Sequence, residues 1–184
     1  MEEKIPAEIN IIFLDIDGVL NVYPQGHDEY GAIFHQHFMD NLKRIVDATN
    51  AKIVVSSTWR SCGLTELQKM WKDRGLAGEV IDITPYGSMK MRYYDREEVP
   101  QTQWSVPRGS EVQNWLLEKR YHYKESVIIK NYVILDDDID FILSQQDNFV
   151  RCSENPDHED CVDCGMGLTS KCTDKAIEIL NKNK

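Results

Sequence analysis

The sequence predicts an α/β protein, built as a three-layer α/β/α sandwich around a mainly parallel sheet. Short apolar segments rich in β-branched residues alternate along the chain with segments whose apolar residues recur at helical spacing. Hydroxyl or acidic residues follow directly after three of the predicted strands. Because the carboxyl ends of parallel strands lie along one edge of a sheet, we expect these polar residues to gather there.

Composition favours one domain with a core of its own. The chain has 184 residues, 41% of them hydrophobic. Its net charge of −10 argues against broad binding to polyanions, which depends on lysine and arginine. No apolar run approaches the roughly 20 residues that span a bilayer, and the start, MEEKIPAEIN, is too acidic for a signal peptide. We therefore expect a soluble, cytoplasmic protein without a membrane partner; the oligomeric state stays open.

The first predicted strand, Ile9 to Leu14, is an almost continuous apolar run, which is typical of a strand buried on both faces. It stops at Asp15 and Asp17, and Gly18 permits a sharp turn after them. Two carboxylates this close repel each other unless something compensates their charge, and a divalent cation commonly does so. An ordinary turn is the alternative, because Asp and Gly are frequent turn residues.

The alternation continues to the end of the chain. After a loop at 22–30 that could cover the strand ends, apolar spacing predicts a helix from Phe34 to about Asn50. A strand from Lys52 ends at the hydroxyl residues Ser56 and Ser57, which could also cap a helix. The remaining predicted elements are a helix at 64–75, a strand at 79–83, a long insert loop at 86–107, a helix after 110, strands at 132–135 and 148–151 with a short helix at 141–144 between them, a cysteine-bearing loop at 152–168 and a last helix around 176–180.

Charged residues stand out at two further positions. Four of the five residues from 136 to 140 are aspartates, and their repulsion would be strong in a turn with only a structural role. A bound cation would relieve it. Arg108 precedes a predicted helix start, where Ser110 and Gln113 form a capping-box pattern. A helix N-terminus attracts anions, so an arginine there indicates a phosphate site.

These motifs resemble those of the haloacid dehalogenase-like (HAD) superfamily. The four HAD motifs would be DIDGV at 15–19, Ser56, Arg108 and DDDID at 136–140. The chain is more closely similar to the small HAD phosphatase-like domains associated with nucleic-acid repair proteins, through the stretches VVSSTWR, RGSEVQNWL, YVILDDD and GLTS. The resemblance runs from Ile9 to Leu180. It implies a single Rossmann-like HAD phosphatase domain over residues 1–184.

The resemblance also implies a mechanism of phosphomonoester hydrolysis. Asp15 would attack phosphorus and form an aspartyl-phosphate, while Asp17 would protonate the leaving oxygen and then activate water. Ser56, with Ser57 beside it, would bind the phosphoryl oxygens. Arg108 stands where the family commonly has lysine, and its forked donors would bind the same oxygens.

Magnesium is the cofactor that the resemblance implies. Its ligands would be the Asp15 carboxylate, the Asp17 backbone carbonyl and Asp137, with Asp136 close by. The register within 136–138 is ambiguous, so which of these carboxylates binds the metal stays open. Phosphoryl transfer needs a nucleophile, charge neutralisation and positioning, and these residues would supply all three.

Two other classes of protein stay open. A receiver-type signalling module also joins acidic residues, a hydroxyl and a cation on a parallel sheet, but it carries its phosphorylated aspartate after the third strand. Here that strand ends at Thr84 and Pro85. A non-catalytic phosphate-binding module is the other possibility, and the complete set of acidic and basic residues argues against it.

The predicted substrate is a phosphate on a large molecule, for instance a nucleic-acid end. HAD enzymes commonly close a mobile cap over small substrates, and neither sequence gap that could hold one leaves room for a folded cap. The bulk of the substrate would then have to exclude water. The insert loop at 86–107 carries basic and aromatic residues that could contact it, namely Lys90, Arg92, Tyr93, Tyr94, Arg96 and Trp104. A small metabolite, a nucleotide or a phosphoprotein stays possible.

Cysteines near the C-terminus raise the possibility of a zinc site. The candidate ligands are Cys152, Cys161, Cys164 and Cys172, of which the middle two form a C-x-x-C pair. The outer spacings of eight and seven residues match no standard zinc module. Free thiols in a surface loop fit this irregular spacing better than zinc does.

Overall fold

The computed structural model describes residues 7–22, 26–86, 88–90, 103–122, 127–152 and 166–182. Its central sheet has five strands in the order β5-β4-β1-β8-β9, and every pairing within this sheet is parallel. The strands are β1 (Ala7–Leu14), β4 (Lys52–Val55), β5 (Val80–Ile83), β8 (Val127–Asp136) and β9 (Phe149–Arg151). The prediction of an α/β fold on a mainly parallel sheet is confirmed.

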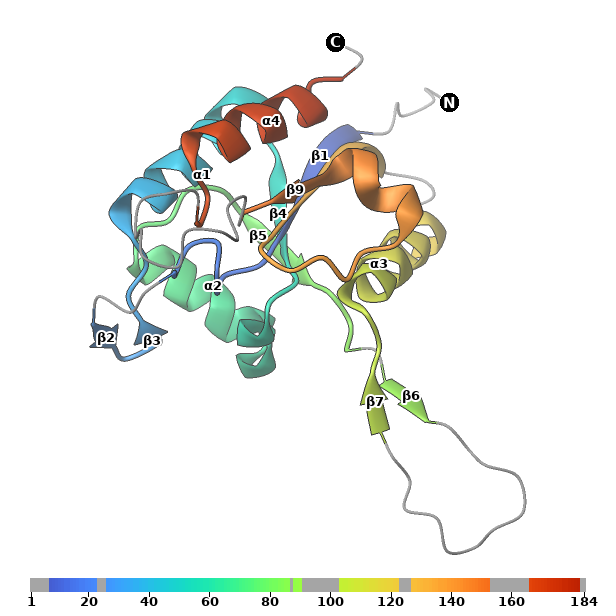
Figure 1. Cartoon of the computed structure of the whole chain (residues 1–184), viewed down its shortest axis with the longest axis horizontal. Helices are drawn as coiled ribbons and strands as arrows, with labels where there is room; N and C mark the ends of the chain where they lie inside the picture. The colour runs from blue at the N-terminus through green and yellow to red at the C-terminus, as the bar shows by residue number, and fades with distance from the viewer. Residues whose placement is uncertain are drawn as a thin grey trace, which may run out of the picture.

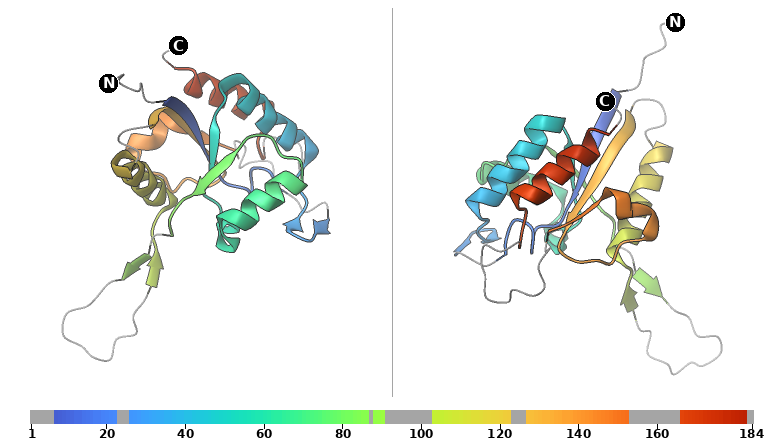
Figure 2. Two further views of the ribbon diagram at one scale, coloured as in Figure 1. Left: turned by 180° about the vertical axis from the view of Figure 1, so that it is seen from behind. Right: turned by 45° about the horizontal axis from the view of Figure 1, so that its top comes forward.

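Helices cover both faces of the sheet and complete the three layers (Figures 1 and 2). One face packs against three helices, which are α1 (Gln36–Thr49), α2 (Leu64–Asp73) and α4 (Ser170–Leu180). The other face packs against α3 (Arg108–His122). Two 3₁₀ helices, η1 (Thr58–Cys62) and η2 (Leu143–Asn148), follow strands β4 and β8. No helix in the described part of the chain is long and apolar enough to cross a membrane.

Strand β1 is the middle of the sheet, and its sequence explains its burial. Ile12 and Leu14 face the cluster formed with α1, α2 and α4, whereas Ile11 and Phe13 face α3. All four side chains are fully buried, so the strand needs apolar residues at both alternating positions. Phe13 meets Trp115 of α3 edge to face, with ring centroids 5.2 Å apart.

The register of the sheet places polar residues side by side at its carboxyl edge. The Asp15 N–H donates to the Leu135 carbonyl at 2.9 Å, and the Ser56 N–H donates to the Leu14 carbonyl at 2.9 Å. The residue after β1 therefore lies between the residue after β4 and the end of β8. This alignment follows from parallel pairing, which brings the carboxyl ends of neighbouring strands together.

Several element boundaries differ from the sequence prediction. Strand β8 begins at Val127, five residues before the predicted Tyr132, because its first half is not a continuous apolar run. Ile128 is 49% exposed, and Nδ2 of Asn131 donates to the carbonyls of Leu180, the last residue of α4, and of Lys182. The helix predicted at 141–144 is the 3₁₀ helix η2, which begins at Leu143.

Both predicted loops contain short antiparallel hairpins. The segment at 22–30 leads into β2 (His27–Asp28) and β3 (Gly31–Ala32). The insert at 86–107 contains β6 (Ser88–Lys90) and β7 (Gln103–Ser105), and this hairpin projects away from the sandwich (Figure 1). Strands of two or three residues are too short for hydrophobic alternation to reveal them.

Candidate active site

Arg108, the first residue of α3, contacts groups that three strands bring to the carboxyl edge of the sheet. Its Nη1 is 3.0 Å from Oδ1 of Asp15, which follows β1. Its Nε is 3.5 Å from Oδ2 of Asp136, the last residue of β8. Nη1 also donates to the backbone carbonyl of Ser56, directly after β4. The predicted nucleophile, one predicted metal ligand and the predicted phosphate-binding arginine are therefore in contact with one another.

Three carboxylates form a compact cluster beside this arginine. One oxygen from each of Asp15, Asp136 and Asp137 lies within 4.8 Å of the others. Asp138 is exposed and outside the cluster, and its backbone N–H donates to Oδ1 of Asp136 at 2.9 Å. Of residues 136–138, Asp136 and Asp137 therefore bring a carboxylate into the cluster, whereas Asp138 does not.

A hard divalent cation fits this set of donors. Carboxylate oxygens are the ligands that magnesium prefers, and three of them converge here. The Oδ2 of Asp136 is buried and accepts no hydrogen bond from the described residues. Its ion pair with Nε of Arg108 is long, at 3.5 Å. A cation would satisfy this oxygen, and HAD proteins typically use magnesium.

Burial dominates the electrostatics of the cluster. Burial raises the pKa of Asp136 to about 8, and the nearby Asp15 adds to this rise while Arg108 opposes it. The pKa of Asp15 is also raised by burial, against the opposing effects of Arg108 and of a hydrogen bond from Ser57. Burial likewise raises the pKa of Asp137. The single positive charge of Arg108 does not balance the charge of three ionised carboxylates. A bound cation would therefore stabilise their ionised forms.

Gly18 makes room for one of these carboxylates. A Cβ at this position would lie 2.1 Å from Cγ of Asp137, and the backbone φ of +75° is one that glycine adopts readily. The sequence predicts only that Gly18 permits a turn after the aspartate pair. The structure adds that the bare backbone lets Asp137 approach from β8.

The side chain of Asp17 lies outside the carboxylate cluster and is exposed. Its Oδ2 accepts a hydrogen bond from Nε1 of Trp59 at 3.0 Å, and its Oδ1 accepts one from Nδ2 of Asn21 at 3.2 Å. Neither donor was identified from the sequence as a site residue. Trp59 belongs to the VVSSTWR stretch, but only the fold shows that its indole reaches Asp17.

The two predicted phosphate-binding serines occupy different positions. The Ser57 hydroxyl donates a hydrogen bond to the Asp15 carboxylate. The Ser56 hydroxyl is buried and has no hydrogen-bond partner among the described residues, while its carbonyl accepts from Arg108. In this structure Ser57 therefore presents its hydroxyl to Asp15, and Ser56 contacts Arg108 through its backbone.

The N-terminus of α3 differs from the prediction in two ways. The helix begins at Arg108, two residues before the predicted cap Ser110. Its first N–H, that of Arg108, donates to Oδ2 of Asp140 at 2.8 Å, so a carboxylate of the protein binds where a phosphate was expected. Gly109 permits this contact, because a Cβ there would lie 2.7 Å from the backbone nitrogen of Ile142. The arginine side chain, not the helix end, faces Asp15.

The candidate zinc ligands fall partly outside the described residues. Cys161 and Cys164 belong to the segment 153–165, which is not described. Cys152 and Cys172 are buried, and their thiols are hydrogen-bonded to each other. The zinc hypothesis stays a prediction.

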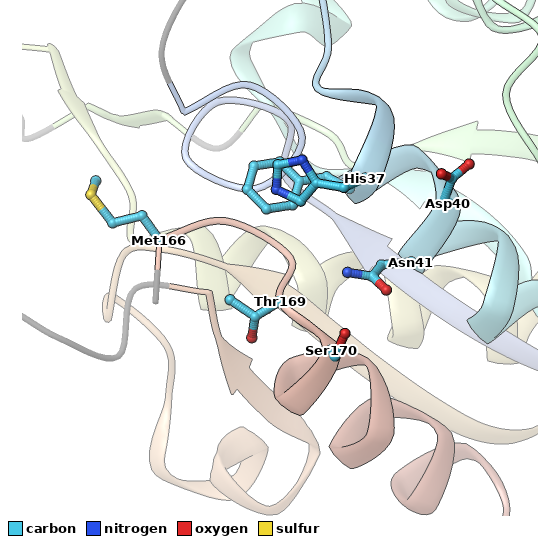
Figure 3. Close-up of a pocket in the computed structure, with 7 residues that line it drawn as sticks. His37, Asp40, Asn41, Met166, Thr169 and Ser170 are labelled. Atoms are coloured by element: carbon cyan, nitrogen blue, oxygen red, sulfur yellow. The ribbon is translucent and has the colours of Figure 1, made fainter. Parts of the chain in front are cut away.

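A cavity of about 370 Å³ lies between the start of α1 and the segment leading into α4 (Figure 3). Its lining includes His37, Asn41 and Thr169 but none of the clustered aspartates. Of the predicted substrate-contacting residues, Lys90 and Trp104 belong to β6 and β7. The other four, Arg92, Tyr93, Tyr94 and Arg96, fall in 91–102, outside the described residues.

Three features of an all-parallel sheet define a HAD-type protein: an aspartate pair after β1, hydroxyls after β4, and Asp136 and Asp137 at the end of β8. Residues 11–156 match the model of the family described as the HAD domain in Swiss Army Knife RNA repair proteins. The chain belongs to this family, which indicates a hydrolase of the HAD type. No curated protein and no solved structure matches the chain.

Proposed function

We propose that the protein is a magnesium-dependent phosphomonoester hydrolase that forms an aspartyl-phosphate at Asp15. The observation that carries the proposal is the convergence of Asp15, Asp136 and Asp137 within 4.8 Å, beside the Arg108 guanidinium, in a chain of the HAD family. This arrangement holds a carboxylate nucleophile next to a fixed positive charge and a site for a cation, which phosphoryl transfer requires.

The residues divide the reaction between them. The Asp15 carboxylate attacks phosphorus, the ester P–O bond breaks, and Asp17 gives its proton to the leaving oxygen. Asp17 then takes a proton from water, the water oxygen attacks the aspartyl-phosphate, and inorganic phosphate leaves as the Asp15 carboxylate is restored. Donors of Arg108 and Ser57 stabilise charge on the phosphoryl oxygens. Bound magnesium would neutralise part of the same charge.

Hydrolysis of an aryl phosphate is the direct test of the proposed reaction. Purified protein should release nitrophenolate from p-nitrophenyl phosphate with magnesium, stop in EDTA, and recover when magnesium is restored. Acid-quenched enzyme should carry a phosphoryl group that is stable in acid and labile in alkali. A receiver-like module would accept phosphate from acetyl phosphate without hydrolysing esters, and a binding module would do neither. Absence of magnesium-dependent ester hydrolysis would overturn the proposal.

A large phosphorylated substrate, such as a nucleic-acid end, is the second part of the proposal. The β2–β3 segment is fastened to the body and does not resemble a free lid: Arg74, directly after α2, binds Asp28 through two hydrogen bonds of 2.6 and 2.9 Å, and the Tyr30 hydroxyl donates to Asp73. Among the described residues, the gap from 18 to 52 holds the β2–β3 hairpin and α1, and the gap from 58 to 107 holds η1, α2, β5 and the β6–β7 hairpin. Both α1 and α2 pack into the core, so the described part of neither gap forms a separate cap. The family description, which names RNA repair proteins, favours a nucleic-acid end over a phosphoprotein.

Competing substrates separate the possibilities. We expect kcat/KM to be higher for an oligonucleotide with a terminal phosphate than for the matching mononucleotide or a phosphopeptide. Raising the salt concentration should reduce the preference, because contacts with a nucleic-acid backbone are salt-dependent. A mononucleotide hydrolysed as well as the oligonucleotide would exclude the nucleic-acid end, and a preferred phosphopeptide would identify a protein phosphatase.

A further inference from the structure

Asp17 is held by two side chains that the proposed mechanism does not use. Nε1 of Trp59 donates to one carboxylate oxygen at 3.0 Å, and Nδ2 of Asn21 donates to the other at 3.2 Å. Asn21 is in turn set by the backbone, since the Gly18 N–H donates to the Asn21 carbonyl at 2.8 Å. An exposed aspartate would ordinarily sample several rotamers, and two donors from different directions restrict it to one.

Trp59 is itself fixed by its surroundings. Its ring meets Phe34 with centroids 5.3 Å apart, and the guanidinium carbon of Arg74 lies 5.4 Å from the ring centroid. Gly31 of β3 approaches so closely that a Cβ there would lie 3.2 Å from Cη2 of the indole. Gly31 of β3, Phe34 before α1 and Arg74 directly after α2 therefore pack around the indole, and this packing sets the direction of its N–H.

An indole suits the support of a group that must gain and lose a proton. The N–H of tryptophan donates and cannot accept, so it cannot take the proton of a neutral carboxyl group. It also carries no charge, unlike the arginine beside Asp15. Asp17 can therefore be oriented by Trp59 in both of its protonation states, and its proton stays available for the leaving oxygen.

Resting on the proposed function, we propose that Trp59 is a positioning residue that orients Asp17 as the general acid toward the leaving group. Trp59→Phe removes the N–H but keeps an aromatic ring in this packing. Leaving-group dependence of kcat/KM then reports the acid step, because this constant covers phosphoryl transfer to Asp15 and not the later hydrolysis. Good leaving groups, such as 2,4-dinitrophenolate, need little protonation, whereas an alkyl alkoxide needs it strongly.

We expect Trp59→Phe to lower kcat/KM for an alkyl phosphate by roughly tenfold or more, and for 2,4-dinitrophenyl phosphate by less than about threefold. Asp17→Asn should show the same pattern with a larger loss. Trp115→Phe is a matched control, because Nε1 of Trp115 in α3 also donates to an aspartate, Asp82 of β5, at 2.9 Å. Trp115→Phe should change kcat/KM by the same factor for both substrates, even if it lowers the stability of the fold.

The outcomes separate this inference from the proposed function. Wild-type protein without phosphatase activity refutes the function. Active wild-type protein in which Trp59→Phe lowers kcat/KM equally for both leaving groups, or for neither, refutes the positioning role alone. An Asp17→Asn variant without leaving-group dependence also refutes it, since Asp17 would then not be the acid. Circular dichroism of each variant shows whether the fold is retained.

Discussion

The surroundings of Asp15 and of Asp17 differ sharply although the two residues are separated only by Ile16. Asp15 is buried, contacts the charged Arg108 at 3.0 Å and shares a cluster with two other carboxylates. Asp17 is exposed and is held by the neutral donors of Trp59 and Asn21. One side chain faces β8 and a site for positive charge, and the other faces η1.

This difference indicates how a D-x-D motif can separate two chemical roles. A carboxylate that attacks phosphorus should stay ionised and fixed, which a contacting arginine and a cation favour. A carboxyl group that gives a proton to the leaving group and then takes one from water must be stable both protonated and ionised. Neutral hydrogen-bond donors and contact with solvent permit this. Four substitutions or conditions test the contrast, from the largest expected effect to the smallest.

Asp15→Asn should reduce hydrolysis to background and abolish the acid-stable phosphoryl label, because the amide is nearly isosteric with the carboxylate but is not a competent nucleophile. Turnover and label are measured together, with circular dichroism as the check of folding. A folded Asp15→Asn protein that still becomes labelled would move the nucleophile to another residue.

Asp17→Asn should slow turnover by roughly 100-fold or more, the range expected for a lost general acid and base, while the label at Asp15 persists. With 2,4-dinitrophenyl phosphate the enzyme should release one burst of phenolate and then stall, because water is not activated. Rapid-quench measurement of the burst shows this. A slow steady rate without a burst would place the main role of Asp17 before phosphoryl transfer.

Asp136→Asn and Asp137→Asn should weaken magnesium binding by at least the roughly 10- to 100-fold that follows loss of a residue supporting a metal ligand. Asp138→Asn is the matched control, because it makes the same change in charge one residue away, outside the cluster. Titration of activity with magnesium gives the apparent affinities. An equal loss of magnesium affinity in all three variants would mean that the total negative charge of the acidic segment, and not individual ligands, determines binding.

Without metal, the protein should lose stability as the pH rises from about 4 toward 8. Asp136 has a pKa of about 8 in the folded chain, against about 3.9 unfolded, so over this range the folded state binds the extra proton and the slope of unfolding free energy against pH is negative. Asp15 and Asp137 shift in the same direction.

Urea midpoints measured in EDTA from pH 5 to 9 test this slope. Asp136→Asn should flatten it, and magnesium should stabilise the wild type more at pH 8 than at pH 6, since the metal binds ionised carboxylates. The carboxylate of Asp28, whose pKa is lowered chiefly by its hydrogen bonds with Arg74, titrates below this range and does not interfere. Identical slopes for wild type and variant would show that Asp136 is ionised throughout.

Much of this architecture could be predicted because parallel strands share an edge. Strands that run in one direction bring Asp15, Ser56 and Asp136 together whatever their loops do, so the gathering of the site was predictable from strand ends alone. Strand β1 was also predictable from its hydrophobic run, because a strand buried on both faces has no polar positions to interrupt the run.

Side-chain direction was not predictable, because a one-residue step reverses the face of a strand end. The sequence therefore did not distinguish Ser56 from Ser57, or Asp137 from Asp138. Contacts between distant segments were equally unpredictable. Trp59 donates a hydrogen bond to Asp17 across 42 residues of sequence, and Asp140 accepts one from the first N–H of α3 across 32 residues. Such contacts depend on how loops pack, which no local pattern encodes.

The pairing of β1 with β8 also sets the order in which this site can form during synthesis. Leu14 pairs with Leu135, so at a ribosomal rate of roughly 5–20 residues per second, about 120 residues, or roughly 6–24 seconds of translation, separate the two strands. Until then one edge of the most apolar strand has no partner, and Asp15 has neither Asp136 nor Asp137 beside it. A metal site formed by Asp15, Asp136 and Asp137 would therefore be complete only after β8 has joined the sheet.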